Sequence, residues 1–239
     1  VNVSNITMRN VKGTAIFLRL GNRGRPYRAE RPGVGLMRNI IISNVQATEV
    51  GDWIEREGKR VVGCSITGLH DHPIESLTLD NIRIRFKGGG TLKDAAREVA
   101  ERPVAYPSCR MFGTLPAYGF FCRHVRNVRF HNVDLRFAND DHRPALFFDD
   151  VRNLSIFDLD GQSTPSTPAL IRLRQVDGVL IHGSRPREMA GPLLRVEGDE
   201  SANIRLVGND LTRVGQVADV GEEVPPGALF FLPGRDDRK

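Results

Sequence analysis

The chain repeats a short pattern of apolar and polar residues. In each copy, a polar residue is followed by two apolar side chains at alternate positions and then by Asn or Asp. Weaker copies begin at Gly178 and Asn203. Because apolar and polar residues alternate with a period of two, the copies predict β-strands. The clear copies are 5–10, 39–44, 76–81, 127–132 and 153–158.

The spacing of the copies indicates how the strands are arranged. Successive copies begin 34, 37, 51, 26, 25 and 25 residues apart, so the last intervals are nearly constant and the first three contain insertions. Apart from a short helix expected within 92–101, no segment shows the 3.6-residue period of a helix. A repeat of about 25 residues without helices is typical of one coil of a parallel β-helix. We therefore expect an all-β fold, with a single β-helix domain of about seven coils over 1–239.

The polar residue that ends each copy has a predicted structural role. Asn and Asp tolerate the left-handed backbone of a sharp corner, and stacked Asn side chains can hydrogen-bond along a column. The sequence therefore predicts one column at a corner of the β-helix, made of the residues five positions after each start, Asn10, Asn44, Asn81, Asn132 and Asp158.

A second apolar strand accompanies most copies. When the valines at 125, 151 and 176 are aligned, these strands present two outward polar columns. Solenoids bind extended polymers on surfaces of this kind. One predicted column holds Arg123, Asp149 and Arg174, and the other holds His124, Asp150 and Gln175.

Three insertions interrupt the repeat, near 21–35, 50–60 and 87–116. Insertions in a solenoid form loops, often on the binding face. The first carries Tyr27 and several arginines, which suit either a uronate chain or a solvated basic loop, because guanidinium groups bind carboxylates bidentately. The third is long for a structureless loop, so we expect it to cross the groove in which a polymer would bind. The arginines of the first insertion are Arg23, Arg25, Arg28 and Arg31.

Composition narrows the class of partner. The formal charge of +5 suits a polyanion, although a solvated basic surface is an equal alternative. Three cysteines are too few for a disulfide framework, and no CxxC pair suggests a metal site. No run of about 18 apolar residues indicates a membrane span. The chain opens directly on a strand pattern without a signal peptide, so we expect it to begin inside a domain.

Several strings of residues resemble the bacterial branch of glycoside hydrolase family 28, the polygalacturonase-like enzymes. The resemblance covers about 1–161, and its most specific part is MFGTLPAYGFFCRH at 111–124. It implies a right-handed, single-stranded parallel β-helix of the pectin lyase-like type that hydrolyses α-linked galacturonate chains with inversion. It also implies an acidic polysaccharide as partner, secretion or a periplasmic location, and no cofactor, metal, nucleic-acid or membrane partner. The other matching strings are 14–25, 64–69, 106–107 and 141–146.

The chain departs from the family at the catalytic motifs. Inversion requires two carboxylates with room for a water molecule between them. The family places its aspartates in Asn-Thr-Asp and Asp-Asp motifs, ahead of Gly-His-Gly and Arg-Ile-Lys. Here Asn-Thr-Asp and Gly-His-Gly are absent, the Asp-Asp pairs come too late, and Arg-Ile-Lys is matched only by Phe17-Leu18-Arg19. We therefore assign no catalytic residue and expect the acids to lie upstream of Val1, in an N-terminally truncated β-helix.

The resemblance suggests the residues that contact substrate. Tyr118 resembles the family's substrate-contacting tyrosine, whereas Arg123 and His124 either face the groove or pair with Asp149 and Asp150. Asp141 and Arg143 are expected to form a corner ion pair. A non-catalytic β-helix that binds acidic glycans and a phage tailspike-like adhesin remain alternatives. The expected substrate-binding residues are Arg19, Arg23, Arg25, Tyr118, Arg123 and His124.

Overall fold

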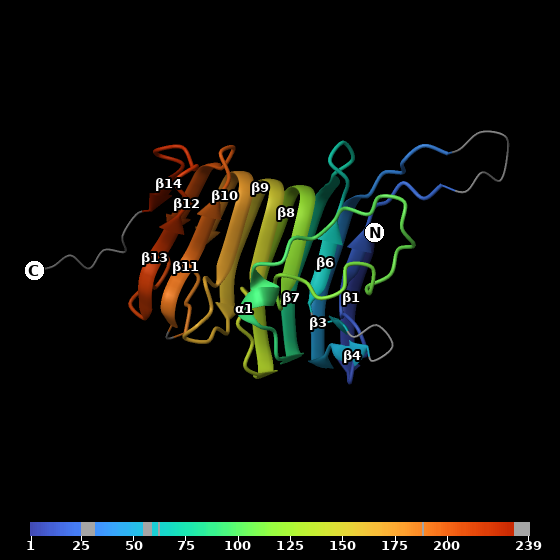
Figure 1. The fold of residues 1–239 in the computed structure, drawn as a ribbon, viewed down its shortest axis with the longest axis horizontal. Helices are drawn as coiled ribbons and strands as arrows, with labels where there is room; N and C mark the ends of the chain where they lie inside the picture. Colours follow the sequence, from blue (N-terminus) through green and yellow to red (C-terminus); the bar gives the residue numbers. More distant parts are fainter. Residues whose placement is uncertain (25–31, 55–58, 62, 188, 232–239) are drawn as a thin grey trace, which may run out of the picture.

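The computed structural model describes residues 1–24, 32–54, 59–61, 63–187 and 189–231. Nearly all of its regular structure is β-strand, as Figure 1 shows. The elements are β1 (Asn2–Arg9), β2 (Phe17–Arg19), β3 (Arg38–Val50), β4 (Asp52–Ile54), β5 (Lys59–Val61), β6 (Cys64–Thr67), β7 (Ile74–Gly88), α1 (Leu92–Ala95), β8 (Phe120–Asn139), β9 (Leu146–Gly161), β10 (Ile171–His182), β11 (Met189–Glu197), β12 (Ala202–Val207), β13 (Val214–Val220) and β14 (Leu229–Phe231).

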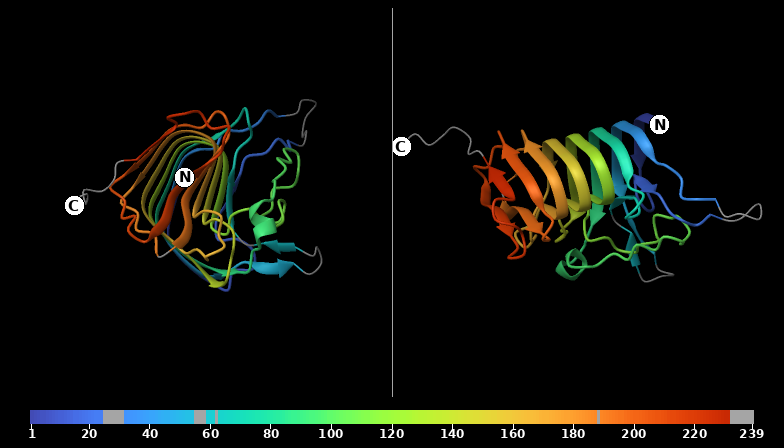
Figure 2. Two further views of the ribbon diagram at one scale, coloured as in Figure 1. Left: turned by 60° about the vertical axis from the view of Figure 1, so that its left-hand side comes forward. Right: turned by 90° about the horizontal axis from the view of Figure 1, so that it is seen from above.

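Twelve of the strands form one parallel sheet, which confirms the all-β prediction. Its main path runs β1-β3-β7-β8-β9-β10-β11-β13, so each long strand pairs with a strand one repeat further along the chain. The short strands β2 and β6 join this sheet through β8. Figure 2 shows the strands stacked one behind another, an arrangement consistent with a parallel β-helix. The insertion near 50–60 contains an antiparallel pair, β4 and β5. No helix in the described part of the chain is long and apolar enough to cross a membrane.

The long strands bend where single residues adopt left-handed backbone. In β8 these residues are His124, Asn127 and Asn132, with φ of 54°, 56° and 50°. In β9 their register partners, Asp150, Asn153 and Asp158, repeat the same bends. Asn and Asp occupy most of these positions because their short polar side chains tolerate this backbone at low cost.

The predicted asparagine column forms, with one correction at its first member. Asn81 Nδ2 donates to Asn44 Oδ1 at 2.8 Å, and Asn132 Nδ2 donates to Asn81 Oδ1 at 3.2 Å. Asn44 Nδ2 donates to Asn5 Oδ1 at 3.0 Å, so Asn5 takes the place predicted for Asn10. The register explains the change, since it places the apolar residues of β1 opposite those of β3: Val3 opposite Ile42, Ile6 opposite Val45 and Met8 opposite Ala47.

The inward side chains of successive coils form one continuous core. Phe120, Phe130 and Phe148 pack edge to face, with ring centroids 5.4 and 5.3 Å apart. All three are completely buried. Burying an aromatic side chain contributes about 2–3 kcal/mol of hydrophobic free energy. Burial of these side chains between coils therefore stabilises the stacking of each coil on its neighbours.

The 87–116 insertion packs on the outside of the sheet. Its helix is shorter than predicted: α1 ends at Ala95, and Thr91 caps it by accepting from Asp94 N at 3.2 Å. Apolar side chains of the insertion form a second cluster over two outward phenylalanines, Phe121 of β8 and Phe147 of β9. Figure 2 shows this green segment running along the outside of the stack. The side chains that cover the phenylalanines are Val99, Met111, Phe112 and Leu115.

A buried ion pair fastens both ends of the insertion. Arg143 and Asp141 have no exposed side-chain surface, and Arg143 Nη2 lies 2.7 Å from Asp141 Oδ2. Gly90 N donates to the same carboxylate at 3.0 Å, and Arg143 Nη1 donates to Leu115 O at 2.9 Å. The predicted corner ion pair is therefore confirmed, and it joins the beginning of the insertion to its end.

Candidate functional site

A single column of polar residues runs along the outward face of β2, β6, β8, β9, β10 and β11. The predicted stacking of Arg123, Asp149 and Arg174 is confirmed by the register of β8, β9 and β10. Arg19 extends the column at one end, because it pairs through Thr67 with Arg123. We call Arg19, Thr67, Arg123, Asp149, Arg174 and Glu197 the polar column.

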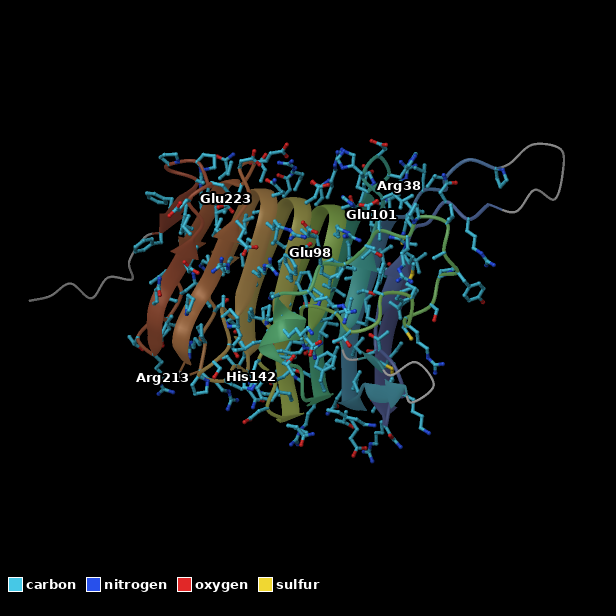
Figure 3. All side chains as sticks on the ribbon, in the orientation of Figure 1. Arg38, Glu98, Glu101, His142, Arg213 and Glu223 are labelled. Carbon is cyan, nitrogen blue, oxygen red and sulfur yellow. The ribbon has the colours of Figure 1, made fainter. Side chains whose placement is uncertain are left out.

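The 87–116 insertion covers the polar column. Arg19 Nη2 donates to Glu101 O at 2.7 Å, and Arg123 Nη1 donates to Val99 O at 2.6 Å. Arg174 Nη1 donates to Glu98 Oε1 at 2.7 Å. Figure 3 shows Glu98 and Glu101 over the strands of the stack. The insertion was expected to cross a groove; here it occupies the face where the groove was expected.

Arg123 is buried beneath the insertion with part of its guanidinium unused. Its side chain is 6% exposed, and Nε and Nη2 meet no acceptor among the described residues. Burial lowers the pKa of Arg123, and the nearby Asp149 carboxylate opposes that shift. An unsatisfied buried donor costs about 1–3 kcal/mol. In this conformation Arg123 cannot meet a polymer from solution, contrary to its predicted substrate-contacting role.

Tyr118 belongs to the core, which corrects its predicted role as a substrate contact. Its side chain has no exposed surface. Its hydroxyl donates to Gln162 O at 2.7 Å, and its ring packs against Phe137 with centroids 5.2 Å apart. Burial raises the pKa of Tyr118 well above its usual range. Tyr118 lies two residues before the buried Phe120, so the alternation of side chains along the strand places both on the inward face.

The arginines expected near the first insertion have separate positions. Arg19 is half-buried and donates to Gly68 O at 3.0 Å as well as to the insertion. Arg23 stacks on the exposed ring of Tyr106, with its guanidinium carbon 4.6 Å from the ring centroid. Arg25 lies outside the described residues. Arg19 thus hydrogen-bonds to the chain itself, and Arg23 stacks on Tyr106.

His124 is enclosed by acidic side chains at the corner of the stack. Its Nδ1 lies 2.6 Å from Asp150 Oδ2, and its Nε2 hydrogen-bonds to Glu101 Oε1. Burial disfavours the imidazolium, but these hydrogen bonds outweigh it and raise the pKa of His124. The hydrogen bond from His124 lowers the pKa of Asp150. The pairing with Asp150 that was considered from the sequence is therefore present, and Glu101 is a second partner.

His70 completes a cluster with His124 and Asp150. Its Nδ1 lies 3.8 Å from Asp150 Oδ2, and its ring stands edge to face on His124 with centroids 5.7 Å apart. The ligand atoms of the three side chains lie within 4.8 Å of one another. Imidazole nitrogens and a carboxylate oxygen are a donor set that binds transition-metal ions. Among the described residues, these three are the group able to hold a metal ion.

A hollow of about 440 Å³ lies beside this cluster and opens to solvent. Asp150 and His70 line it, together with arginines that stack along the coils. The register places Arg38 opposite Glu75, Glu75 opposite Arg126, and Arg126 opposite Arg152. Arg38 and Arg126 are exposed and form no ion pair with a described residue. The remaining polar lining residues are Asp71 and His72. We call this space the corner hollow.

The arginines of the corner hollow did not emerge from the sequence, although a signal exists. Arg38, Arg126 and Arg152 each stand immediately before the Asn that begins a copy of the repeat. Reading the repeat one position upstream would have predicted their column. His70 has no comparable signal, because it lies in the turn between β6 and β7, outside the repeated pattern.

No family model, curated protein or solved structure matches the chain. Function is therefore inferred from the charges, burial and contacts of the described side chains.

Proposed function

We propose that the chain is a right-handed, single-stranded parallel β-helix of the pectin lyase-like type, and that it holds substrate in a glycoside hydrolase acting on pectic polysaccharide. The parallel stacking of the strands supports the fold. The strings that resemble family 28 support the reaction class. Because pectic polymers lie outside the cells that degrade them, the proposal includes a secreted or periplasmic location.

The observation that carries the proposal is the corner hollow with Arg38 and Arg126, which form no ion pair with a described residue. Arg38 and Arg126 belong to the same column, and neighbouring strands of a sheet lie about 4.8 Å apart. A guanidinium can bind a carboxylate through two parallel hydrogen bonds. Glu75 lies between Arg38 and Arg126 in the column, so their strands are two spacings, about 9.6 Å, apart, and the two arginines can bind carboxylates on different sugars of a uronate chain.

The acids of the corner hollow complement its arginines. Asp71, Glu75 and Asp150 line the same space, so its formal charges balance when its histidines are neutral. Carboxylates accept hydrogen bonds from hydroxyl groups, and a uronate presents both hydroxyls and a carboxylate. This mixture of charges favours a uronic acid chain over a polyanion without hydroxyl groups. It also replaces Arg19, Tyr118 and Arg123 as the centre of the proposed binding surface.

The role proposed for these 239 residues in the reaction is to hold substrate. The Asn-Thr-Asp and Gly-His-Gly motifs of the family are absent from the chain, and its Asp-Asp pairs come too late in the sequence. General acid–base catalysis contributes about 10²- to 10⁴-fold to the rates of such reactions, so binding groups alone do not supply it. Binding without hydrolysis is therefore the result expected of this chain, and a non-catalytic β-helix that binds acidic glycans would give the same result.

Calorimetric titration with tri-galacturonate, beside a reducing-sugar assay, tests the proposal. We expect binding that weakens as salt increases, because exposed ion pairs are screened. Arg126→Ala and Arg38→Ala should each weaken it several-fold, whereas Arg213→Ala should not. Arg213 is an exposed arginine at the far end of the stack from Arg38 (Figure 3). Equal affinities for the Arg126 and Arg213 variants, or no binding at low salt, would overturn the proposal.

A further inference from the structure

Three side chains from different coils converge at the corner of the stack. His70 lies in the turn after β6, His124 at the first bend of β8, and Asp150 at the corresponding bend of β9. The register stacks His124 directly against Asp150, because the residues on either side of them pair between β8 and β9. The backbone therefore holds two of the three groups in fixed positions, and the turn brings the third to them.

The distances suit a bound metal ion. Zinc bonds of about 2.0–2.2 Å in tetrahedral geometry separate neighbouring ligand atoms by about 3.3 Å. The observed separations are 3.8 Å from His70 Nδ1 to Asp150 Oδ2 and 2.6 Å from His124 Nδ1 to the same oxygen. These two separations differ from the required value by less than about 1 Å, and all three ligand atoms lie within 4.8 Å of one another. The side chains of His70 and Asp150 are 78% and 28% exposed, so His70 can approach the ion and the Asp150 carboxylate can turn away from His124 by this amount.

Glu101 has the position of an outer partner for a metal-binding histidine. It hydrogen-bonds to Nε2 of His124, whereas Nδ1 of the same ring lies 2.6 Å from Asp150 Oδ2. Metal-binding histidines commonly donate their second N–H to a carboxylate, which fixes the ring and leaves the other nitrogen free for the ion. In this arrangement Glu101 accepts from Nε2, and Nδ1 is directed at the ion.

We propose that His70, His124 and Asp150 bind one divalent transition-metal ion of the zinc class, with Glu101 as a positioning residue for His124. Two nitrogens and one oxygen favour such an ion over Mg²⁺ or Ca²⁺, which prefer oxygen ligands throughout. The charge of the ion balances the carboxylates of Asp150 and Glu101. Three protein ligands leave a coordination position open, as in catalytic zinc sites. His70 and Asp150 line the corner hollow, so this position faces a space that a ligand can enter.

The site does not depend on the pectic proposal, because no sugar enters the argument for it. The ion also links two parts of the chain, since Glu101 belongs to the 87–116 insertion and the three ligands belong to the stack. Binding of the ion should therefore hold the insertion more firmly against the corner.

The chain provides a matched control for the metal site. His131 Nδ1 lies 2.5 Å from Asp80 Oδ1, so this second histidine–aspartate pair lies on neighbouring coils in the same way. Both side chains are exposed, and no third ligand within the described residues completes a group there. His131→Ala removes a histidine of the same kind without touching the proposed site.

Isothermal titration of the full chain with ZnCl₂, after removal of metal by a chelator and of any affinity tag, tests the proposal. We expect one ion per chain. His70→Ala should weaken binding at least tenfold, and because this side chain is exposed, the variant should fold normally. Glu101→Gln should weaken it about 10- to 100-fold, in line with the loss of other outer carboxylate partners. His131→Ala should bind as the unaltered chain does.

Each contrary result bears on a specific part of the proposal. Absence of zinc binding by the unaltered chain, or equal affinity in the His70 and His131 variants, would overturn the site. Unchanged affinity in Glu101→Gln would overturn the positioning role. Thermal unfolding provides a second measurement, since an ion that binds the folded chain raises the melting temperature. That rise should disappear in His70→Ala and remain in His131→Ala.

Discussion

Replacing Arg143 with Met should destabilise the chain more than replacing any exposed arginine. Arg143 and Asp141 are completely buried, so the substitution leaves the Asp141 carboxylate without its cation in the interior. It also removes the guanidinium donor to Leu115 O. Removing one partner of a buried ion pair typically lowers the free energy of unfolding by about 3–5 kcal/mol. Since folded domains are stable by only about 5–15 kcal/mol, this loss is a large share of the total.

The double variant separates the unpaired charge from the lost packing. Asp141→Asn combined with Arg143→Met removes both charges and keeps a donor and an acceptor at position 141. We expect it to recover part of the lost stability, because an apolar or neutral replacement of a buried pair is often close to neutral. Arg85→Met, at an exposed position of β7, is the matched control and should change the free energy of unfolding by less than about 0.5 kcal/mol.

Urea unfolding followed by circular dichroism measures these differences, and hydrogen exchange shows where they act. Because the pair joins Gly90 to Leu115, exchange should increase throughout the 87–116 insertion in Arg143→Met. If Arg143→Met costs no more than Arg85→Met, the pair does not stabilise the fold as the structure indicates. If stability falls while the insertion stays protected, the pair stabilises the stack without fastening the insertion.

Two further predictions concern the insertion and the corner column. The hydrogen bond from Arg174 lowers the pKa of Glu98, so this contact stabilises the folded chain above the unfolded pKa of about 4.3 and is lost as pH falls through the folded value. Protection factors in 96–106 should therefore fall in acid, and Glu98→Gln should remove most of that pH dependence. Asn81→Ala should cost about 1–3 kcal/mol in urea unfolding, because Asn81 has φ of 53° and bonds to Asn44 and Asn132. Asn81→Gly should lower the free energy of unfolding less than Asn81→Ala, because glycine adopts positive φ without strain. Equal losses in the two variants would show that backbone strain does not contribute to the loss in Asn81→Ala.

The stacking of coils was predictable because its signals are local. Alternation with a period of two identifies the strands, and Asn at a fixed offset identifies the bends. The alignment of the valines at 125, 151 and 176 predicts the register of Arg123, Asp149 and Arg174, which the strand pairing confirms. The buried pair of Asp141 and Arg143 was also foreseeable, since a charged pair two residues apart at a corner can close on itself.

The features that could not be predicted depend on contacts between distant segments. Asn5 displaced Asn10 from the corner column because the register of β1 is fixed by packing against β3, which a repeat alignment does not measure. The path of the 87–116 insertion follows from its apolar contacts with Phe121 and Phe147, whose outward direction is not evident from the strand pattern. The resemblance predicts that Tyr118 contacts substrate, but a match between short strings of residues does not show whether a side chain is buried, as Tyr118 is.

The 87–116 insertion covers the polar column, so weaker tri-galacturonate binding by a variant in this column has two possible causes. Arg19 donates to the carbonyls of Gly68 and Glu101, so Arg19→Ala should loosen the insertion whether or not Arg19 ever contacts a uronate. Weaker tri-galacturonate binding by that variant would therefore not by itself locate the groove. Arg126 lies in the corner hollow and makes no ion pair with a described residue, so Arg126→Ala should leave hydrogen exchange in the insertion unchanged. A variant that weakens binding while the insertion stays protected identifies a binding residue, and Arg126 meets that criterion better than Arg19.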